Sequence, residues 1–118
     1  MSGAVGDDTN GKWYLSELTK SGVNCAKILT KENISTGVAP ITVATSSGEN
    51  RIVVIPGANL KLTPEDLEKN RELVQNAKII VCQNEISDKT TKKVEIIPVC
   101  PFNFFLKFAG FGWLFIFS

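Results

Sequence analysis

The 118-residue sequence contains no histidine and only 3 cysteines, and this scarcity excludes several kinds of chemistry. Cys25, Cys82 and Cys100 lie far apart, so neither a zinc site nor a disulfide framework is expected. Without a histidine to activate it, each cysteine should be a small buried apolar residue rather than a nucleophile. Cysteines outside disulfides are typical of a reducing compartment, and we expect a cytoplasmic protein.

The chain also lacks an excess of charge of either sign, with 13 basic and 12 acidic residues. We therefore expect neither nucleic acid nor an acidic membrane as a partner. Residues 1–4 show neither the basic start nor the apolar core of a signal peptide. The length is that of one domain at most.

Phenylalanine is absent from the first 101 residues, whereas all 7 phenylalanines, and Trp113 with them, fall between Phe102 and Phe117. So abrupt a change in composition divides the sequence into an ordinary α/β segment, residues 1–93, and an anomalous apolar tail, residues 94–118.

Three origins of this tail stay open. Its prolines, Asn103 and Lys107 interrupt it, and its apolar part is shorter than the roughly 20 residues of a membrane-spanning helix. It also lacks helical or alternating periodicity. We favour a truncated or mis-spliced coding sequence that appends non-native residues after about Lys93. An interfacial or membrane segment and a genuine part of the fold are the alternatives.

Three helices are predicted from capping residues and helical spacing: Asp8 to about Lys20, Thr63 to about Asn76, and Ser87 to Lys93. Leu15 and Leu18 should form the inner face of the first helix, and Gly22 should end it. Val23–Leu29 is expected to be a short connection or a strand. The apolar run Lys78–Cys82 predicts a strand buried on both faces of a parallel sheet.

Residues 38–55 predict a hairpin, because two short apolar runs flank the turn-forming cluster Ser46–Asn50. Strand alternation places Ile41 and Thr42 on opposite faces. Pro40 removes a backbone donor, so its strand should be an edge or locally irregular there.

Three motifs follow one another in an informative order: Gly6-Asp7-Asp8-x-x-Gly11, then Thr36-Gly37-Val38-Ala39 through Gly57-Ala58-Asn59, then Val81-Cys82-Gln83-Asn84-Glu85. In this order and spacing they resemble the ribokinases, which are ATP-dependent sugar kinases of the PfkB carbohydrate kinase family. We interpret Gly6-Asp7-Asp8 and Gly57-Ala58-Asn59 as structural, with Asp8 capping a helix and the glycines providing positive φ at turns. The resemblance covers about Val5 to Lys93.

This resemblance implies an α/β fold: part of a three-layer α/β/α sheet with a small β lid, the hairpin 38–55. It implies phosphoryl transfer from ATP, with Mg²⁺, to a sugar hydroxyl. Ribose is favoured over the substrates of fructokinases and adenosine kinases, which share the architecture. It also implies a homodimer formed through the lid.

The Gly-Gly-Lys-Gly sugar motif and the Gly-Ala-Gly-Asp anion hole of ribokinases occur nowhere in these residues. The chain therefore resembles an internal slice of such an enzyme. We expect no catalytic, nucleotide-binding or metal-binding residue in it and no activity from it alone. Two other roles stay open: a non-catalytic module that pairs through its lid with a full-length kinase subunit, and a fragment without function.

Glu85 is the main candidate for a ligand contact, since it stands just beyond a predicted strand end, where open α/β sheets bind ligands. A carboxylate there can accept hydrogen bonds from sugar hydroxyls, although the pattern alone also describes a solvated loop residue. The resemblance implies that Glu85 contacts the sugar. It further implies that Ala39 and Ile41 lie over the sugar, whereas the pattern alone describes a half-buried strand.

Overall fold

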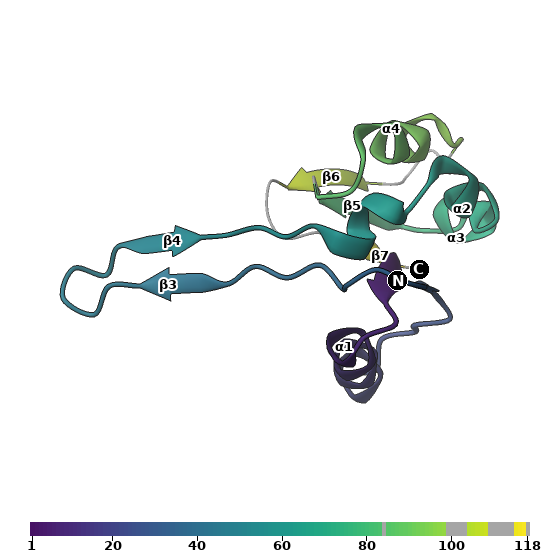
Figure 1. Cartoon of the computed structure of the whole chain (residues 1–118). Helices are drawn as coiled ribbons and strands as arrows, with labels where there is room; N and C mark the ends of the chain where they lie inside the picture. Colours follow the sequence, from purple (N-terminus) through teal and green to yellow (C-terminus); the bar gives the residue numbers. More distant parts are fainter. Residues whose placement is uncertain (84, 99–103, 109–114, 118) are drawn as a thin grey trace.

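The structure, a computed structural model, describes residues 1–83, 85–98, 104–108 and 115–117. Its strands are β1 (Ser2–Gly6), β2 (Lys27–Lys31), β3 (Ile41–Val43), β4 (Asn50–Ile52), β5 (Ile79–Gln83), β6 (Phe104–Phe108) and β7 (Phe115–Phe117). Its helices are α1 (Thr9–Lys20), α2 (Pro64–Glu68), α3 (Arg71–Gln75) and α4 (Asp88–Ile96), with a 3₁₀ turn, η1 (Gly57–Lys61). Figure 1 shows α1 on one side of the strands, α2–α4 on the other, and a hairpin arm projecting from the body. The predicted α/β class is confirmed.

Nothing in the sequence pattern predicts β1, which pairs in parallel with β2 from Ser2 opposite Lys27 to Gly6 opposite Lys31. All five residues of β1 are buried. They are small, and Val5 alone among them is β-branched, so the usual composition signal of a strand is weak. The strand β2 falls partly within the predicted connection or strand, but it begins at Lys27 and runs on to Lys31.

Helix α1 begins and ends where the capping residues predict. The backbone N–H of Gly11 donates to Oδ1 of Asp8 at 2.8 Å, and Gly22 has a φ of 77° just beyond the last turn. Leu15 and Leu18 are only half-buried, and Gly11 is the buried residue of the helix. The inner face of α1 is therefore shallower than predicted.

The prediction of one helix from Thr63 to Asn76 is wrong, because the chain forms α2 and α3 with a break between them. At the break, the N–H of Asn70 donates to the carbonyl of Leu67 at 2.9 Å, three residues back, which is a tight turn. Asn70 is buried, while Leu67 and Val74 reach the same apolar cluster. Since these two are seven residues apart, their spacing also fits a continuous helix, and the sequence pattern hides the break.

Helix α4 and strand β5 each differ from the prediction in one respect. Helix α4 is capped by Ser87 as predicted but continues to Ile96, and both Val94 and Ile97 are buried. Strand β5 is buried on one face rather than both, since Ile80 is 1% exposed and Ile79 is 41% exposed.

Among the described residues, most of the buried apolar side chains form two clusters. The helix cluster consists of Leu67, Val74, Ala77, Ile80, Cys82, Val94 and Ile97. The β1 cluster consists of Ala4, Ala58, Leu62 and Ile86, with Leu29 and Ile34 packed against it. A buried hydrogen bond joins them, in which the hydroxyl of Thr90 on α4 donates to the carbonyl of Leu62 at 2.7 Å. The site described below lies beside the β1 cluster.

The predicted hairpin is confirmed. Strands β3 and β4 are antiparallel with Ile41 opposite Ile52, and Val38 pairs with Ile55 at the root. Strand β3 begins just after Pro40, whose carbonyl accepts a hydrogen bond from Val53 at 3.0 Å. The local irregularity expected at Pro40 is therefore present.

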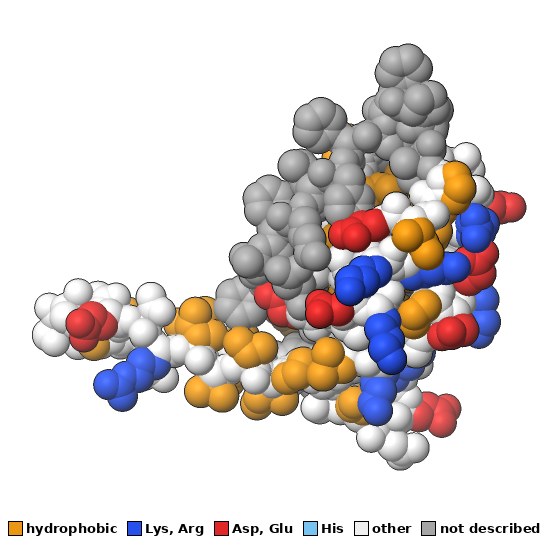
Figure 2. Space-filling view, turned by 90° about the horizontal axis from the view of Figure 1, so that it is seen from above, with side chains coloured by type: hydrophobic (Ala, Val, Ile, Leu, Met, Phe, Trp, Pro, Cys, Tyr) orange, Lys and Arg blue, Asp and Glu red, His pale blue; other side chains and the backbone are white. Residues whose placement is uncertain are grey.

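The hairpin arm leaves an unusual amount of apolar surface uncovered. Six of its side chains are 44% to 61% exposed: Ile41, Val43, Ile52, Val53, Val54 and Ile55. Figure 2 shows hydrophobic side chains along the arm. Isolated exposed apolar residues are common, but a contiguous group of this kind marks a surface that meets another molecule or segment.

Two strands of the tail pair with β5. Strand β6 is parallel to it, with Ile79 opposite Phe104, and β7 is antiparallel on its other side, with Ile79 opposite Phe117. The expectation that residues 94–118 are not part of the native fold stays a prediction. Cys100 and Trp113 lie outside the described residues.

Candidate functional site

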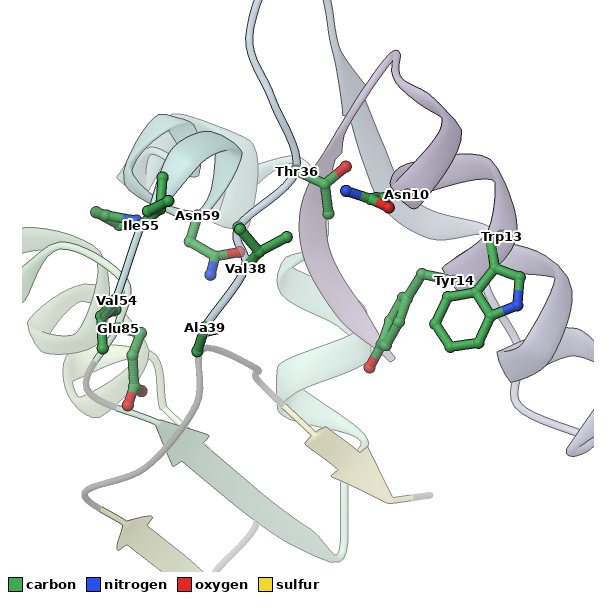
Figure 3. Close-up of a pocket in the computed structure, with 12 residues that line it drawn as sticks. Asn10, Trp13, Tyr14, Thr36, Val38, Ala39, Val54, Ile55, Asn59 and Glu85 are labelled. Carbon is green, nitrogen blue, oxygen red and sulfur yellow. The ribbon is translucent and has the colours of Figure 1, made fainter. Parts of the chain in front are cut away.

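A cavity of about 240 Å³ lies where the hairpin root, α1 and the loop after β5 meet (Figure 3). Its lining comes from α1 (Asn10, Trp13, Tyr14), the hairpin root and adjoining residues (Thr36, Gly37, Val38, Ala39, Val54, Ile55, Pro56), η1 (Asn59) and the loop after β5 (Glu85). Residues far apart in the sequence thus converge on one small volume, as in most ligand sites of α/β proteins.

Glu85 lies two residues beyond the last residue of β5, and its side chain faces this cavity. The atom Oε2 is buried and has no hydrogen-bond partner among the described residues. A buried carboxylate oxygen without a partner is costly, and such groups in native proteins usually serve a ligand or a reaction. Oε2 of Glu85 is therefore an acceptor available to an occupant of the cavity.

Asn59 supplies a second polar group to the same side of the cavity. It is only 8% exposed, and η1 holds it close to the hairpin root. A Cβ atom on Gly37 would lie 2.6 Å from Nδ2 of Asn59 and 2.7 Å from the backbone oxygen of Pro56, so only glycine allows this approach. The amide can both donate and accept a hydrogen bond.

Thr36 joins the start of α1 to the hairpin root through Asp8. Its hydroxyl donates to Oδ1 of Asp8 at 2.6 Å and accepts from the N–H of Gly6 at 3.0 Å. Its own N–H donates to Oδ2 of Asp8 at 2.9 Å. The hydroxyl of Thr36, with the amides of Gly11 and Thr36, lowers the pKa of Asp8 below its ordinary value. We call this set of contacts the Asp8–Thr36 link.

The prediction that the motif glycines have positive φ is right at Gly57 and wrong at Gly6. Gly57 has a φ of 49°, as a turn residue should. Gly6 and Gly11 are not among the glycines with positive φ. A Cβ on Gly6 would lie 2.2 Å from the carbonyl oxygen of Ile34, and one on Gly11 would lie 2.3 Å from that of Gly6. These two glycines are needed because backbone segments touch there.

The structure brings two of the three sequence-predicted site residues together. Glu85 and Ala39 line the same cavity, Ala39 from the hairpin root. Ile41 is 52% exposed, lies two residues further along the arm, and is not among the lining residues. The sugar contacts assigned to all three stay predictions.

The wall formed by α1 is the part of the site that the sequence pattern does not predict. Asn10, Trp13 and Tyr14 lie at spacings of three and four residues, which puts them on one face of the helix. Trp13 is 63% exposed, and Tyr14 is half-buried. Burial, together with the nearby Cys25, raises the pKa of Tyr14. Their spacing is visible in the sequence, but the direction in which this face points depends on tertiary packing.

The lining residues do not fit Mg²⁺ or a nucleotide phosphate. Among the described residues that line the cavity there is neither lysine nor arginine, and Glu85 is the one carboxylate. Within the described ranges, no three or more Asp, Glu, Cys or His side chains gather closely enough to hold a metal ion. The cavity is suited instead to a small neutral molecule with hydroxyl groups.

Among the helices of the described residues, none is long and apolar enough to cross a membrane.

Comparison with known proteins identifies the family. Residues 1–97 match the model of the pfkB family carbohydrate kinases. The chain therefore belongs to the pfkB family of carbohydrate kinases. Within it, ribokinases are among the similar proteins: that of Mus musculus is 37% identical over 83 residues, which are 70% of this chain and 25% of that protein.

Solved structures agree with this assignment. Ribokinase from Giardia lamblia is 36% identical with a TM-score of 0.69, over 80% of this chain and 29% of that one. Arabidopsis thaliana ribokinase, solved with ribose and ATP, is 32% identical with a TM-score of 0.68, over 83% of this chain and 33% of that one. The chain thus spans between 25% and 33% of the length of these relatives. The predicted partial ribokinase-like fold is confirmed.

Proposed function

We propose that this chain is the sugar-binding part of a ribokinase-type enzyme and that the cavity binds ribose. The buried, unpartnered Oε2 of Glu85 carries the proposal, because a sugar hydroxyl is a donor of the right kind for it. Asn59 offers a further donor and acceptor beside it. The apolar residues of the hairpin root, Ala39 among them, cover the sugar and exclude water. Ile41 covers it as well if the arm bends further over the cavity.

Phosphoryl transfer to that sugar needs more than these residues provide. The reaction depends on a base at the acceptor hydroxyl and on donors around the moving phosphoryl group. Kinases of this family obtain the phosphoryl group from ATP with Mg²⁺, and the residues lining this cavity suit neither. We therefore propose that the 118-residue chain binds the sugar but does not phosphorylate it by itself.

The test is ribose binding to the purified chain, followed by NMR chemical shifts. Replacing Glu85 with Ala should weaken ribose binding by roughly 10- to 150-fold, the scale of a hydrogen bond to a charged group. Glu72→Gln, which alters an exposed carboxylate on α3, serves as the control and should leave binding unchanged. Equal affinities of the Glu85→Ala variant and the unchanged chain would contradict the assignment.

A second assay tests whether the chain alone catalyses phosphoryl transfer. The chain with Mg-ATP and ribose should release ADP at the rate of a buffer blank. Turnover above the blank that disappears with Glu85→Ala would instead show that the chain is a complete and unusually small kinase.

The exposed hairpin arm supports a second role, pairing with another kinase subunit. Its six exposed apolar side chains need a partner surface, and a second copy of the same arm has matching chemistry. We propose a homodimer through the lid. The same surface would serve a non-catalytic module that pairs with a full-length kinase subunit.

We also propose that the protein is located in the reducing cytoplasm. The thiols of Cys25 and Cys82, neither in a disulfide, support this location.

A further inference from the structure

The hairpin arm lacks one hydrogen bond between its root and strand β3. At the root, Val38 and Ile55 exchange two backbone hydrogen bonds, each of 2.9 Å. In the same register Pro40 lies opposite Val53, whose N–H donates to the carbonyl of Pro40 at 3.0 Å. Proline has no N–H, so the return bond to the carbonyl of Val53 is missing. This pair is held by one hydrogen bond, whereas the pair at the root is held by two.

The root is fixed to the body of the chain by close backbone contacts. A Cβ atom on Gly57 would lie 2.3 Å from the carbonyl oxygen of Ser35. The N–H of Ala58 donates to the same carbonyl at 2.9 Å. On the other strand, Gly37 is packed closely against Asn59. Contacts this close leave no room for the root itself to rotate.

Beyond the root, the arm projects away from the body (Figure 1). Residues 40–55 are all exposed, whereas Ala39 is half-buried. The outer part is bonded to itself, since β3 pairs with β4 and the N–H of Ala44 donates to the carbonyl of Glu49 at 2.8 Å. The outer part of the arm is therefore one unit, joined to a fixed root through the singly bonded pair.

We infer that Pro40 is a positioning residue for the sugar, because the arm bends at the Pro40–Val53 pair and thereby brings Ile41 over the cavity. The inference rests on the proposed sugar site and assigns the motion of its cover. Ala39 precedes the bend and already lines the cavity. Ile41 follows the bend and is 52% exposed outside the lining. Ala39 is thus a fixed part of the site, and Ile41 joins the site when a ligand is bound.

The missing hydrogen bond lowers the free energy needed for this bend. Bending the arm at a bonded pair strains the hydrogen bonds of that pair, and here one bond is strained instead of two. Ile41 loses contact with water when it covers an occupant of the cavity, which favours the bent arm once the cavity is filled. The free chain therefore keeps the extended arm, and the ligand shifts the population towards the bent one.

The experiment restores the missing donor. Pro40→Ala adds an N–H opposite the carbonyl of Val53, and slow hydrogen exchange of this new amide reports the added bond. Ribose affinity, followed by NMR chemical shifts, should fall roughly 2- to 12-fold, the net contribution of the one hydrogen bond that the bend now strains. Pro64→Ala removes a proline from the first turn of α2, outside the cavity lining, and should leave the affinity unchanged.

NMR relaxation dispersion locates the bend in the free chain, because it detects motion on the microsecond to millisecond timescale. Amides of β3 and β4 should show exchange in the unchanged chain and less exchange in Pro40→Ala. The amides of Val38 and Ile55 at the root should show none in either. All proteins are compared at one association state, verified by sedimentation velocity.

A double-mutant cycle separates positioning from a general change in stability. Pro40→Ala should have almost no effect on ribose affinity in a chain that also carries Ile41→Ala, because that arm has no large side chain to bring over the sugar. A change that acts only through stability gives the same fold-change in both backgrounds, and this result would overturn the positioning role.

The other failures can be told apart. Ribose binding that depends on Glu85 but is unchanged by Pro40→Ala overturns the positioning role and leaves the sugar site standing. Exchange that includes the root amides, or fast hydrogen exchange of the new amide in Pro40→Ala, overturns the bend at this pair. Failure of ribose to bind overturns the sugar site and the positioning role together, while the relaxation data on the free chain still locate the bend.

Discussion

Thr36 connects the cap of α1, the end of β1 and the hairpin root. It is 4% exposed, and its hydroxyl is both a donor to Asp8 and an acceptor from Gly6. No apolar side chain can replace both functions. The identity of this residue therefore matters more than its size.

Replacing Thr36 with Val should lower the free energy of unfolding by about 1–3 kcal/mol, because the buried N–H of Gly6 loses its acceptor. Urea unfolding measures the change as a shift in midpoint at constant m-value. Thr36→Ser keeps the hydroxyl and is the control, with a loss well below that of Val. Equal losses for the two variants would show that the hydroxyl group of Thr36 contributes no more to stability than its methyl group does.

Glu68 joins α2 to its neighbours through Arg71 on α3 and Lys93 on α4, the latter at 2.9 Å. The hydrogen bond from Arg71, and then that from Lys93, lower the pKa of Glu68 from 4.5 to about 2. A lowered carboxyl pKa stabilises the folded state fully above the unfolded value. This contribution is lost as the pH falls from 4.5 through about 2.

The expected result for Glu68 is a carboxyl titration in NMR with an apparent pKa near 2, displaced upward in 1 M salt because exposed ion pairs are screened. The unfolding free energy of Glu68→Gln should depend less on pH below 4.5 than that of the unchanged chain. Asp8 and Asp66 also have lowered pKa values. Their contribution cancels when the pH profile of the unfolding free energy of Glu68→Gln is subtracted from that of the unchanged chain. Parallel pH profiles would refute the ion-pair assignment.

Among the elements, α1 and β1 are packed more closely than ordinary side chains permit. Gly11 lies in the first turn of α1, where alanine is the better helix former by about 1 kcal/mol. Gly11→Ala should nevertheless destabilise the chain by about 1–3 kcal/mol, because the added Cβ meets the carbonyl of Gly6 and the hydroxyl of Thr36. Thermal unfolding of Gly11→Ala is compared with that of Ser16→Ala, at an exposed position of the same helix. Stabilisation by both variants would contradict the close contact.

The sequence predicts best those helices whose first turn is capped by a nearby side chain. Asp8, Thr63 and Ser87 cap helices at the predicted places because each side chain accepts a hydrogen bond from an N–H three residues on. Strand β1 and the break at Asn70 are set by tertiary packing. The small residues of β1 become a strand by pairing with β2, and the break lies at Asn70, a buried polar residue between Leu67 and Val74 in the sequence.

The candidate site divides in the same way. Glu85 and Ala39 are identifiable because each belongs to a motif that resembles a motif of the ribokinases. The wall of Asn10, Trp13 and Tyr14 is not, since its place beside Glu85 depends on how α1 packs against the hairpin root. That packing follows from the Asp8–Thr36 link and from Gly6 and Gly11, whose roles only the three-dimensional contacts reveal.

At the scale of the whole molecule, the uncovered hairpin arm predicts self-association. Val53 follows Ile52, which lies opposite Ile41, so strand alternation puts Val53 on the other face of the arm from Ile41. Val53→Lys places a charge on that face and should weaken dimerisation at least roughly tenfold, because a charge is costly in an apolar interface. Sedimentation velocity over a range of concentrations measures this effect.

Ile96→Lys is the control for the hairpin, since Ile96 on α4 is a still more exposed isoleucine. It should leave the dimer dissociation constant unchanged. A chain that sediments as a monomer at every concentration, or that responds equally to both lysines, would contradict pairing through the lid.

The position of Glu85 between the two apolar clusters has a consequence for detecting ligands. The chain leaves the helix cluster at Cys82 and enters the β1 cluster at Ile86, so Glu85 lies on the crossing segment. A molecule held between Glu85 and α1 therefore bridges parts of the protein that separate on unfolding. By mass action, the melting temperature of the chain must rise with the concentration of any such molecule, so heat denaturation alone can screen candidate acceptors without catalysis.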